Sequence, residues 1–452
     1  MNYSAQLLTA ICITSFMSPF MGASLNIAVP YISEEYGVAP QIVPYLISAF
    51  MICSTSFLLP CSAIANRFGY HRVYSIGSLL AAFFTVCVTL GPTFESMIAA
   101  RGLQGMAFAL VFCTSMALLF DNIPKEKRGM AVALSVASVY SGLSLAPFIS
   151  GIITQYLNWR VMFYFSAASQ VLSYILIQKV PKDQANATFL PYAKMLMSFA
   201  AIFMILLSLS YFRQSDIFRY ILAAGVLLLV LFLVYESRTE HNIFPVKIIL
   251  ANRVFNFALG ASTFNYMATF SIALLLSLHL QLVVSKSASF TGVFLVIQPV
   301  FMTIFTLIAG KIMGRISSHF ITAIGMLLTT GALFLMSTIE AHTTLWHITL
   351  MQILAGIGFG LFSATNTSIV MESVERTLYA LASGMQSLAR NLGMALGIAI
   401  MTTILNHYIE SPAGTTLYLY ELSWTISLAF TLSGAVCVLG IICCVAGYKF
   451  KS

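Results

Sequence analysis

The sequence reads Gly142-Leu143-Ser144-Leu145-Ala146-Pro147-Phe148-Ile149-Ser150-Gly151 in the middle of a segment that carries no charged side chain from Gly129 to Asn158. Gly142, Ala146 and Ser150 are one helical turn apart, so they share a face with almost no side-chain thickness. We expect a second helix to approach that face closely. Pro147 lacks a backbone donor and clashes with the preceding turn, which predicts a bend. We interpret Gly142, Ala146, Pro147 and Gly151 as a conformational hinge.

The composition of the whole chain indicates the class of protein to which the hinge belongs. Hydrophobic residues make up 59% of the 452 residues and charged residues only 8%, whereas soluble domains contain roughly 25% charged residues. The eight cysteines lie in apolar runs without metal-ligand spacing, so we expect neither a metal site nor a cofactor. The net charge of +8 has no basic cluster on a soluble domain, so nucleic acid is not expected as a partner. The chain is therefore predicted to be an all-α polytopic membrane protein.

Fourteen apolar segments are long enough to cross the bilayer as helices, which takes about 20 residues each. They lie near 6–30, 40–65, 73–93, 96–120, 129–156, 161–179, 195–212, 217–235, 255–280, 289–311, 318–338, 346–370, 378–406 and 423–447. A count of twelve, without the pair 195–212 and 217–235, remains an alternative at this point.

The loop charges predict an orientation. Met1 to Ser33 is uncharged and lacks the basic head of a signal peptide, so the first helix is expected to stay in the mature protein. If both termini are cytoplasmic, most lysines and arginines fall in inner loops, in line with the positive-inside rule. We therefore expect a multi-pass protein of the inner (plasma) membrane with both termini inside.

The two halves of the sequence repeat each other. Arg101–Ala109 aligns with Gln352–Gly360 at an offset of 251 residues, and Gly142 meets Gly393 at the same offset. Ile76–Leu80 meets Ile324–Leu328 at an offset of 248. Such duplication is typical of secondary transporters. It predicts two six-helix bundles, residues 1–185 and 241–452, with 186–240 as an inserted pair of helices.

The hinge segment resembles a known transporter motif. In the major facilitator superfamily, the fifth helix of exporters carries Gly-x-x-x-Gly-Pro-x-x-Gly-Gly. Ala146 and Ser150 stand where that pattern has glycine, and both are small enough to keep the close packing. The resemblance implies the major facilitator fold, with substrate moving between the bundles.

The first helix resembles one subfamily more narrowly. Asn26-Ile27-Ala28-Val29-Pro30 is similar to the Asn-x-Ala-x-Pro ending of the fourteen-helix drug/proton antiporters, the multidrug efflux type. That family usually has an aspartate five residues before the asparagine, where this chain has Met21. The difference matters because an intramembrane carboxylate is the natural group for binding a cation or a proton.

The loop after the second helix resembles the superfamily's Gly-x-x-x-Asp-Arg-x-Gly-Arg-Arg/Lys motif. Arg67, Gly69 and Arg72 match it, whereas Asn66 replaces the aspartate. Asparagine keeps a hydrogen bond but not the charge, so a latch built here is expected to be weaker. We assign Asn66, Arg67, Gly69, Arg72 and Asp121 to a cytoplasmic latch.

A second short match follows the fifth helix. Asn158-Trp159-Arg160 with Phe163 resembles the Asn-Trp-Arg-x-x-Phe signature of the same antiporter family. We expect it to be structural, with Trp159 anchoring the outer rim at the membrane interface.

Polar residues inside the predicted spans are the candidate pathway. Arg101 lies within the fourth span with Gln104 on the same face, and this pair resembles the superfamily's Arg-x-x-Gln-Gly, which is linked to coupling of proton and substrate. Arg390 lies near the middle of the thirteenth span. An intramembrane arginine is costly and normally faces a cavity or a partner, although Arg101 is also near enough to the outer end to snorkel. The predicted substrate/proton pathway is Asn26, Arg101, Gln104, Gln298, Gln352, Asn366, Arg390 and Asn391.

No acidic residue lies deep in a predicted span, while Arg101 and Arg390 do. This balance favours neutral, zwitterionic or anionic substrates over lipophilic cations. Proton coupling would then need one of a few other titratable groups. These are Asp121, Glu34, Glu35, His279, His347 and His407.

Three functions are weighed against these sequence features. The first is a proton-coupled exporter of small amphipathic or drug-like molecules, working by alternating access as a monomer in the lipid bilayer. The second is an importer or facilitator of a neutral or anionic metabolite on the same scaffold, without proton antiport. The third, a membrane-embedded enzyme, is disfavoured because the sequence shows no nucleophile–base pair, metal cluster or paired carboxylates.

Overall fold

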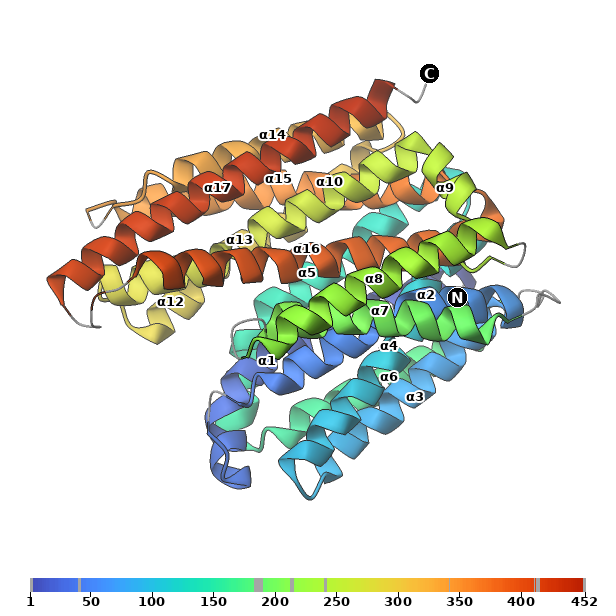
Figure 1. Cartoon of the computed structure of the whole chain (residues 1–452), viewed down its shortest axis with the longest axis horizontal. Coiled ribbons are helices and arrows are strands. Elements are labelled where there is room, and N and C mark those ends of the chain that lie inside the picture. The colour runs from blue at the N-terminus through green and yellow to red at the C-terminus, as the bar shows by residue number, and fades with distance from the viewer. Residues whose placement is uncertain are drawn as a thin grey trace. The chain divides into compact units, whose positions relative to one another are not determined.

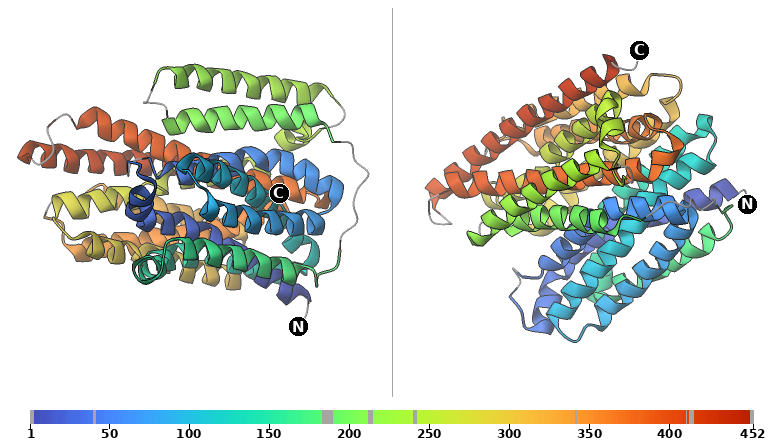
Figure 2. Two further views of the ribbon diagram at one scale, coloured as in Figure 1. Left: turned by 90° about the horizontal axis from the view of Figure 1, so that it is seen from below. Right: turned by 45° about the vertical axis from the view of Figure 1, so that its right-hand side comes forward.

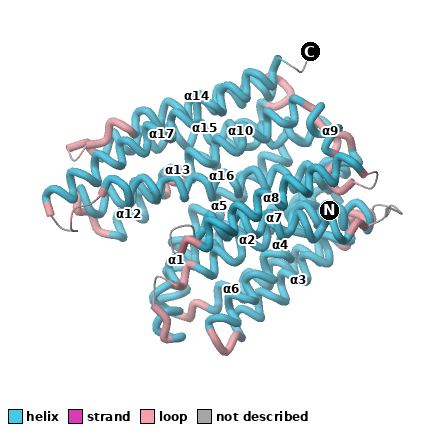
Figure 3. Tube along the Cα trace, viewed as in Figure 1, coloured by secondary structure: helices cyan, strands magenta, loops and turns pink. Residues whose placement is uncertain are grey.

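The computed structural model describes residues 3–39, 42–182, 190–211, 215–239, 242–340, 342–409, 411 and 415–449. Within these ranges the chain is helical with short loops and no strand (Figures 1 and 3). Fourteen helical segments among the described residues are long and apolar enough to span a membrane, which confirms the predicted count over the alternative of twelve. Helices are the natural spanning element because they satisfy their own backbone groups.

The chain divides into two compact units. The first unit contains Met1–Asn252 and Met371–Leu388, and the second contains Arg253–Val370 and Ala389–Ser452. The boundaries predicted from the sequence, at 185/186 and 240/241, lie outside the described residues. The inserted pair of helices is grouped with the first unit.

Most helices of the first unit are long enough to cross the bilayer, whereas α9 is a short connection. Their bounds are α1 Tyr3–Tyr36, α2 Tyr45–Phe68, α3 Tyr70–Leu90, α4 Phe94–Asn122, α5 Lys125–Tyr156, α6 Arg160–Ile177, α7 Tyr192–Tyr211, α8 Ile217–Arg238 and α9 Val246–Ala251. The unit also includes the 3₁₀ turn η2 (Arg376–Leu378) and the start of α16 (Tyr379–Tyr408).

Glycines make the closest crossings in this unit. A Cβ on Gly142 of α5 would overlap the carbonyl oxygen of Phe16 in α1, so the close approach expected of this face is present. Ala146 and Ser150 on the same face are fully buried. Nothing lies within 4 Å of a Cβ placed on Gly151, so this glycine takes no part in the contact. The α5 helix is continuous through Pro147.

The inserted helices α7 and α8 lie side by side, as the green pair in Figure 2 shows, and α7 also packs on α2. A buried ion pair closes one end of this hairpin, with 3.4 Å between Lys194 Nζ and Glu236 Oε2. The Lys194 ammonium also donates to Asn242 Oδ1 at 3.2 Å, and Glu236 accepts from the Ile243 backbone N–H. These additional hydrogen bonds are what a buried ion pair needs to offset its desolvation.

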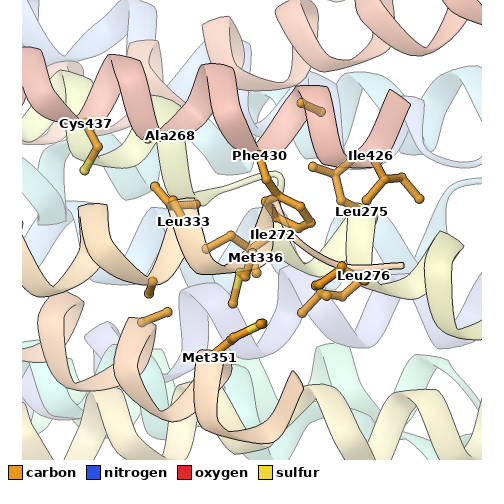
Figure 4. Packing of buried hydrophobic residues seen from close by; sticks show 14 of the residues in the cluster. Ala268, Ile272, Leu275, Leu276, Leu333, Met336, Met351, Ile426, Phe430 and Cys437 are labelled. Carbon is orange, nitrogen blue, oxygen red and sulfur yellow. The ribbon is translucent and has the colours of Figure 1, made fainter. Parts of the chain in front are cut away.

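The second unit has the same kind of construction. Its helices are α10 Arg253–Thr269, α11 Ile272–Leu278, the π-helix η1 His279–Val283, α12 Ala288–Leu295, α13 Ile297–Ile312, α14 Ser318–Met336, α15 Leu345–Glu372, the remainder of α16, and α17 Thr416–Lys449. A buried apolar cluster of side chains joins α10, α11, α14, α15 and α17, and Figure 4 shows part of it. Leu275, Leu276, Leu333, Met336 and Phe430 are fully buried in this cluster.

The internal repeat is visible in the backbone contacts. A Cβ on Gly77 in α3 would lie 3.2 Å from the carbonyl oxygen of Ala107 in α4. In the second unit, a Cβ on Gly325 in α14 would lie 2.7 Å from the carbonyl oxygen of Gly358 in α15. These are aligned positions of the two sequence halves, so the same glycine-thinned crossing is built twice.

Several spans differ from their predicted bounds, and the first and the ninth differ in ways that bear on the site. The first helix continues through Pro30 to Tyr36 rather than ending near residue 30. The ninth span is not one regular helix, because it breaks at Phe270 and Ser271 and ends in the π-helix η1. Prolines and helix breaks are tolerated in membrane spans where neighbouring helices or polar side chains satisfy the freed backbone groups.

Candidate functional site

Arg101 is the most deeply buried charge on the predicted pathway, with 2% of its side chain exposed. Its Nε donates to the carbonyl oxygen of Leu46 in α2 at 3.1 Å, and its Nη1 donates to Gln104 Oε1 at 2.5 Å. Its guanidinium carbon lies 4.8 Å from the centroid of the Phe50 ring. Snorkelling to the membrane surface is therefore ruled out in this conformation.

Gln104 extends this contact to a third helix. Its Nε2 donates to the hydroxyl oxygen of Thr85 in α3 at 2.5 Å, and that hydroxyl donates to the carbonyl oxygen of Ala81. The network holds α2, α3 and α4 around one guanidinium with only neutral acceptors. Because no carboxylate neutralises it among the described contacts, Arg101 leaves a positive field inside the first unit.

Gln352 occupies the repeat position of Arg101 in the second unit. It is fully buried on α15, yet neither its amide oxygen nor its amide nitrogen has a hydrogen-bond partner among the described residues. The repeat therefore places a charged, bonded side chain in one unit and a neutral, unbonded one in the other.

The remaining pathway residues have different surroundings. Asn366 of α15 donates to the carbonyl oxygen of Ala258 in α10 at 3.0 Å. Gln298 is buried on α13, and Asn26 is exposed on α1. Arg390 and Asn391 are half-buried on α16. Arg390 makes no hydrogen bond, ion pair or ring contact with the residues that the structure describes, which leaves its charge available to a solute.

The residues assigned to the latch have different partners. Asp121 pairs with Arg376 rather than with Arg67 or Arg72; Arg376 Nη2 donates to Asp121 Oδ2 at 2.9 Å. The guanidinium carbons of Arg67 and Arg72 instead lie 5.5 Å and 5.9 Å from the centroid of the Phe68 ring.

Tyr70 joins the two parts of this region. Its hydroxyl donates to the carbonyl oxygen of Arg376 at 3.1 Å and approaches Asn66 Oδ1 at 3.5 Å. Gly69 separates α2 from α3 at φ +87°, a conformation that favours glycine. Sequence reasoning missed Arg376 because a lone arginine in a loop resembles any other positive-inside charge.

The end of the first unit where α1 ends and α6 begins holds another ion pair that sequence reasoning missed. Arg160 Nη2 and Nη1 donate to the two carboxylate oxygens of Glu35 at 2.6 Å and 2.8 Å, a bidentate arrangement. Trp159 donates from Nε1 to Glu35 Oε2 at 2.9 Å and is only 3% exposed. Trp159 is therefore buried inside the unit, where it joins the start of α6 to α1.

Comparisons with known proteins agree with this architecture. The sequence model of the Major Facilitator Superfamily matches residues 11–398, and a second match covers residues 258–451. The chain is 22% identical over 443 residues to the riboflavin transporter RibZ of Clostridioides difficile, covering 96% of this chain and 95% of that protein. It is 23% identical to the multidrug transporter protein MdtP of Bacillus subtilis, covering 88% of this chain and 75% of that protein.

A solved structure has the same fold. The human organic anion transporter MFSD10 superimposes with a TM-score of 0.67 at 11% identity, covering 98% of this chain and 97% of that one. At this identity the likeness concerns the fold alone. The match of the family model over most of the chain shows the family itself, whose members are transporters rather than enzymes. The chain belongs to the Major Facilitator Superfamily, as a multi-pass membrane protein that acts as a secondary transporter of a small molecule.

Proposed function

We propose that this chain is a proton-coupled exporter of small amphipathic molecules, neutral or anionic, that works by alternating access. The observation that carries the proposal is the enclosed contact of Arg101 with Gln104, since the matching pair of the superfamily is linked to proton and substrate coupling. We place the protein in the inner membrane as a monomer, with both termini cytoplasmic.

Two features of α5 support export as the direction of transport. Gly142 packs against α1 at backbone distance, and Pro147 interrupts the hydrogen-bond ladder of the same helix one turn later. The combination supports a hinge of the exporter type. The likeness to MdtP, which is named a multidrug transporter, also supports export.

The two arginines of the proposed pathway, Arg101 and Arg390, support a substrate that is not a cation. Arg101 is bonded only to neutral groups, and Arg390 is partnerless among the described residues. A pathway that contains these cations repels a lipophilic cation and attracts an anion.

Import or facilitated movement of a neutral metabolite is the second candidate. Met21 is buried in α1 where the drug/proton antiporters usually have an aspartate, so the most direct proton site of that family is missing. The likeness to RibZ, which is named a riboflavin transporter, favours this candidate and suggests a neutral aromatic heterocycle as the solute.

The experiment uses the full chain in proteoliposomes with an imposed pH gradient of about one unit, which can sustain roughly a ten-fold accumulation ratio for one proton exchanged. Three probes are compared: ethidium as a cation, riboflavin as a neutral solute and carboxyfluorescein as an anion. We expect the anion or the neutral solute to move against its gradient, in the direction opposite to the proton.

Arg390→Ala separates charge selection from general activity. We expect it to reduce carboxyfluorescein transport while riboflavin transport is retained. Equal transport of ethidium and carboxyfluorescein that is unaltered in Arg390→Ala contradicts the charge argument. Transport that ignores the pH gradient contradicts proton antiport and leaves the facilitator.

A further inference from the structure

The ninth span of the second unit is a broken helix that carries unpaired polar groups. The α10 helix ends at Thr269, α11 begins at Ile272, and the π-helix η1 follows from His279. The Ser271 hydroxyl, at the break, is buried without a hydrogen-bond partner among the described residues. Broken helices and π-helical turns inside membrane spans are frequent at binding sites.

His279 is the most unusual of these groups. Its side chain is fully buried, and neither Nδ1 nor Nε2 has a hydrogen-bond partner among the described residues. A neutral imidazole always presents one N–H donor and one acceptor nitrogen. Burying both without partners is unfavourable, so the site is built to be completed by a proton, a water molecule or a solute.

The surroundings of His279 are apolar. Ile272, Leu275 and Leu276 precede it on the buried face of the same span, and Figure 4 shows these side chains in one cluster with Met336 and Met351. Gln352, next to Met351, is buried and also unpaired among the described residues. His279 and Gln352 are therefore two buried polar side chains of the second unit without partners among the described residues, one titratable and one neutral.

The titratable groups on the neighbouring elements do not neutralise His279. Helices α11 and α12 contain none, while Lys286 beyond η1 lies 5.8 Å from the Phe290 ring centroid. Glu421 of α17 accepts hydrogen bonds from Ser411. Other titratable side chains toward this end of the unit are Glu340, His342, His347, His407, Tyr408, Tyr418 and Tyr420.

The other candidates for proton coupling are bonded or exposed. Asp121 is paired with Arg376, and Glu35 with Arg160. Glu34, His347 and His407 are exposed to the surroundings of the protein. Of the six groups that the sequence offers, only His279 is both buried and unpaired among the described residues.

We propose that His279 is the proton-binding residue of this transporter; this rests on the proposed proton coupling. At this buried position no described residue offers the imidazolium a counter-charge or a hydrogen-bond acceptor. When the transport cycle hydrates the broken span, water accepts the N–H bonds and the ring takes up a proton. Closure removes the water and expels the proton, which couples its release to the conformational change.

The test compares driven transport with exchange in the same proteoliposomes. The variants are His279→Gln and His279→Asn, which keep a neutral polar side chain, and His347→Gln is the matched control on an exposed histidine. The probes are riboflavin and carboxyfluorescein. We expect both His279 variants to lose gradient-driven accumulation, about ten-fold for each pH unit imposed. Exchange of internal for external probe without a gradient should persist, which also shows that the variants are folded.

The outcomes separate the two proposals. Wild-type transport that does not respond to the pH gradient overturns proton coupling and the role of His279 with it. Wild-type coupling that persists in both His279 variants overturns His279 alone. Loss of exchange together with accumulation in both variants, while His347→Gln is normal, also overturns the proposal, because it makes His279 structural or substrate-binding rather than a proton carrier.

Discussion

At the scale of single residues, the buried polar side chains are of two kinds, those that bond one another and those without a partner among the described residues. Arg101, Gln104 and Thr85 satisfy one another in the first unit, whereas Gln352 and His279 in the second are buried and unpaired among the described residues. A satisfied network gives rigidity, and unsatisfied groups give a site that responds to water or solute. The Arg101 network is therefore expected to be stiff, whereas Gln352 and His279, like Gln170 of α6 in the first unit, are open to water or solute.

Gln104→Leu tests the stiff network. The substitution removes the acceptor of the Arg101 guanidinium and the donor to Thr85, leaving buried polar groups without partners. We expect a loss of about 1–3 kcal/mol in stability and reduced transport, measured as thermal unfolding in detergent and probe flux. Gln281→Leu is the control, because Gln281 bonds only within its own helical segment, to Ser277. An equal loss of stability in both variants would show that the network contributes no more than a hydrogen bond within one helical segment.

At the scale of helices, backbone-to-backbone crossings decide which elements touch. Gly142 brings α5 onto α1, and Gly105 brings α4 onto the backbone of α2 at Phe50. Lipid tails are as apolar as the side chains, so helices in a membrane gain most from close packing. A residue without a side chain at the crossing is what permits that packing.

Two glycines of α5 form a matched pair for testing this. In Gly142→Ala the new methyl group overlaps the Phe16 carbonyl oxygen, so we expect α1 and α5 to separate at a cost of about 1–3 kcal/mol. In Gly151→Ala the methyl group meets nothing within 4 Å, and the helix should gain about 0.5–1 kcal/mol. Thermal unfolding of the two variants measures the difference, and a destabilised Gly151→Ala would refute the distinction.

At the scale of the whole molecule, the duplication explains why the same crossing appears in both units. The contact of Gly77 with Ala107 in the first unit aligns, in the sequence repeat, with the contact of Gly325 with Gly358 in the second. A duplicated bundle gives two similar scaffolds on which different polar residues have been placed. This accounts for one fold carrying an arginine in one unit and a glutamine at the same position in the other.

The proposed orientation is tested across the single span α14, which runs from Ser318 to Met336. Ser317→Cys and Thr338→Cys place a thiol at its two exposed ends, in a background in which the natural cysteines are replaced by alanine. The positive-inside rule, applied to Lys311 and Arg315, predicts that Cys at 317 faces the cytoplasm. An impermeant maleimide should label intact cells at 338 only; labelling at 317 instead would reverse the topology.

The sequence alone predicted the span count, the fold class, the duplication and the shared helix face of Arg101 and Gln104. The length of an apolar run, the spacing of residues along a helix and the free-energy cost of a polar side chain in a bilayer are properties of short segments. They can therefore be predicted from the sequence. The packed face of α5 followed from the same local rules, while its role as a hinge stays a prediction.

Only the tertiary structure decided which distant residues pair. Asp121 with Arg376 and Glu35 with Arg160 join positions far apart in the chain, and nothing in either local sequence specifies its partner. The break at Ser271 and the burial of both His279 nitrogens likewise depend on how α10, α11 and α17 pack together. Local sequence sets which helices form, but a side chain's partners are set by the packing of the whole unit, and the candidate proton site depends on that packing.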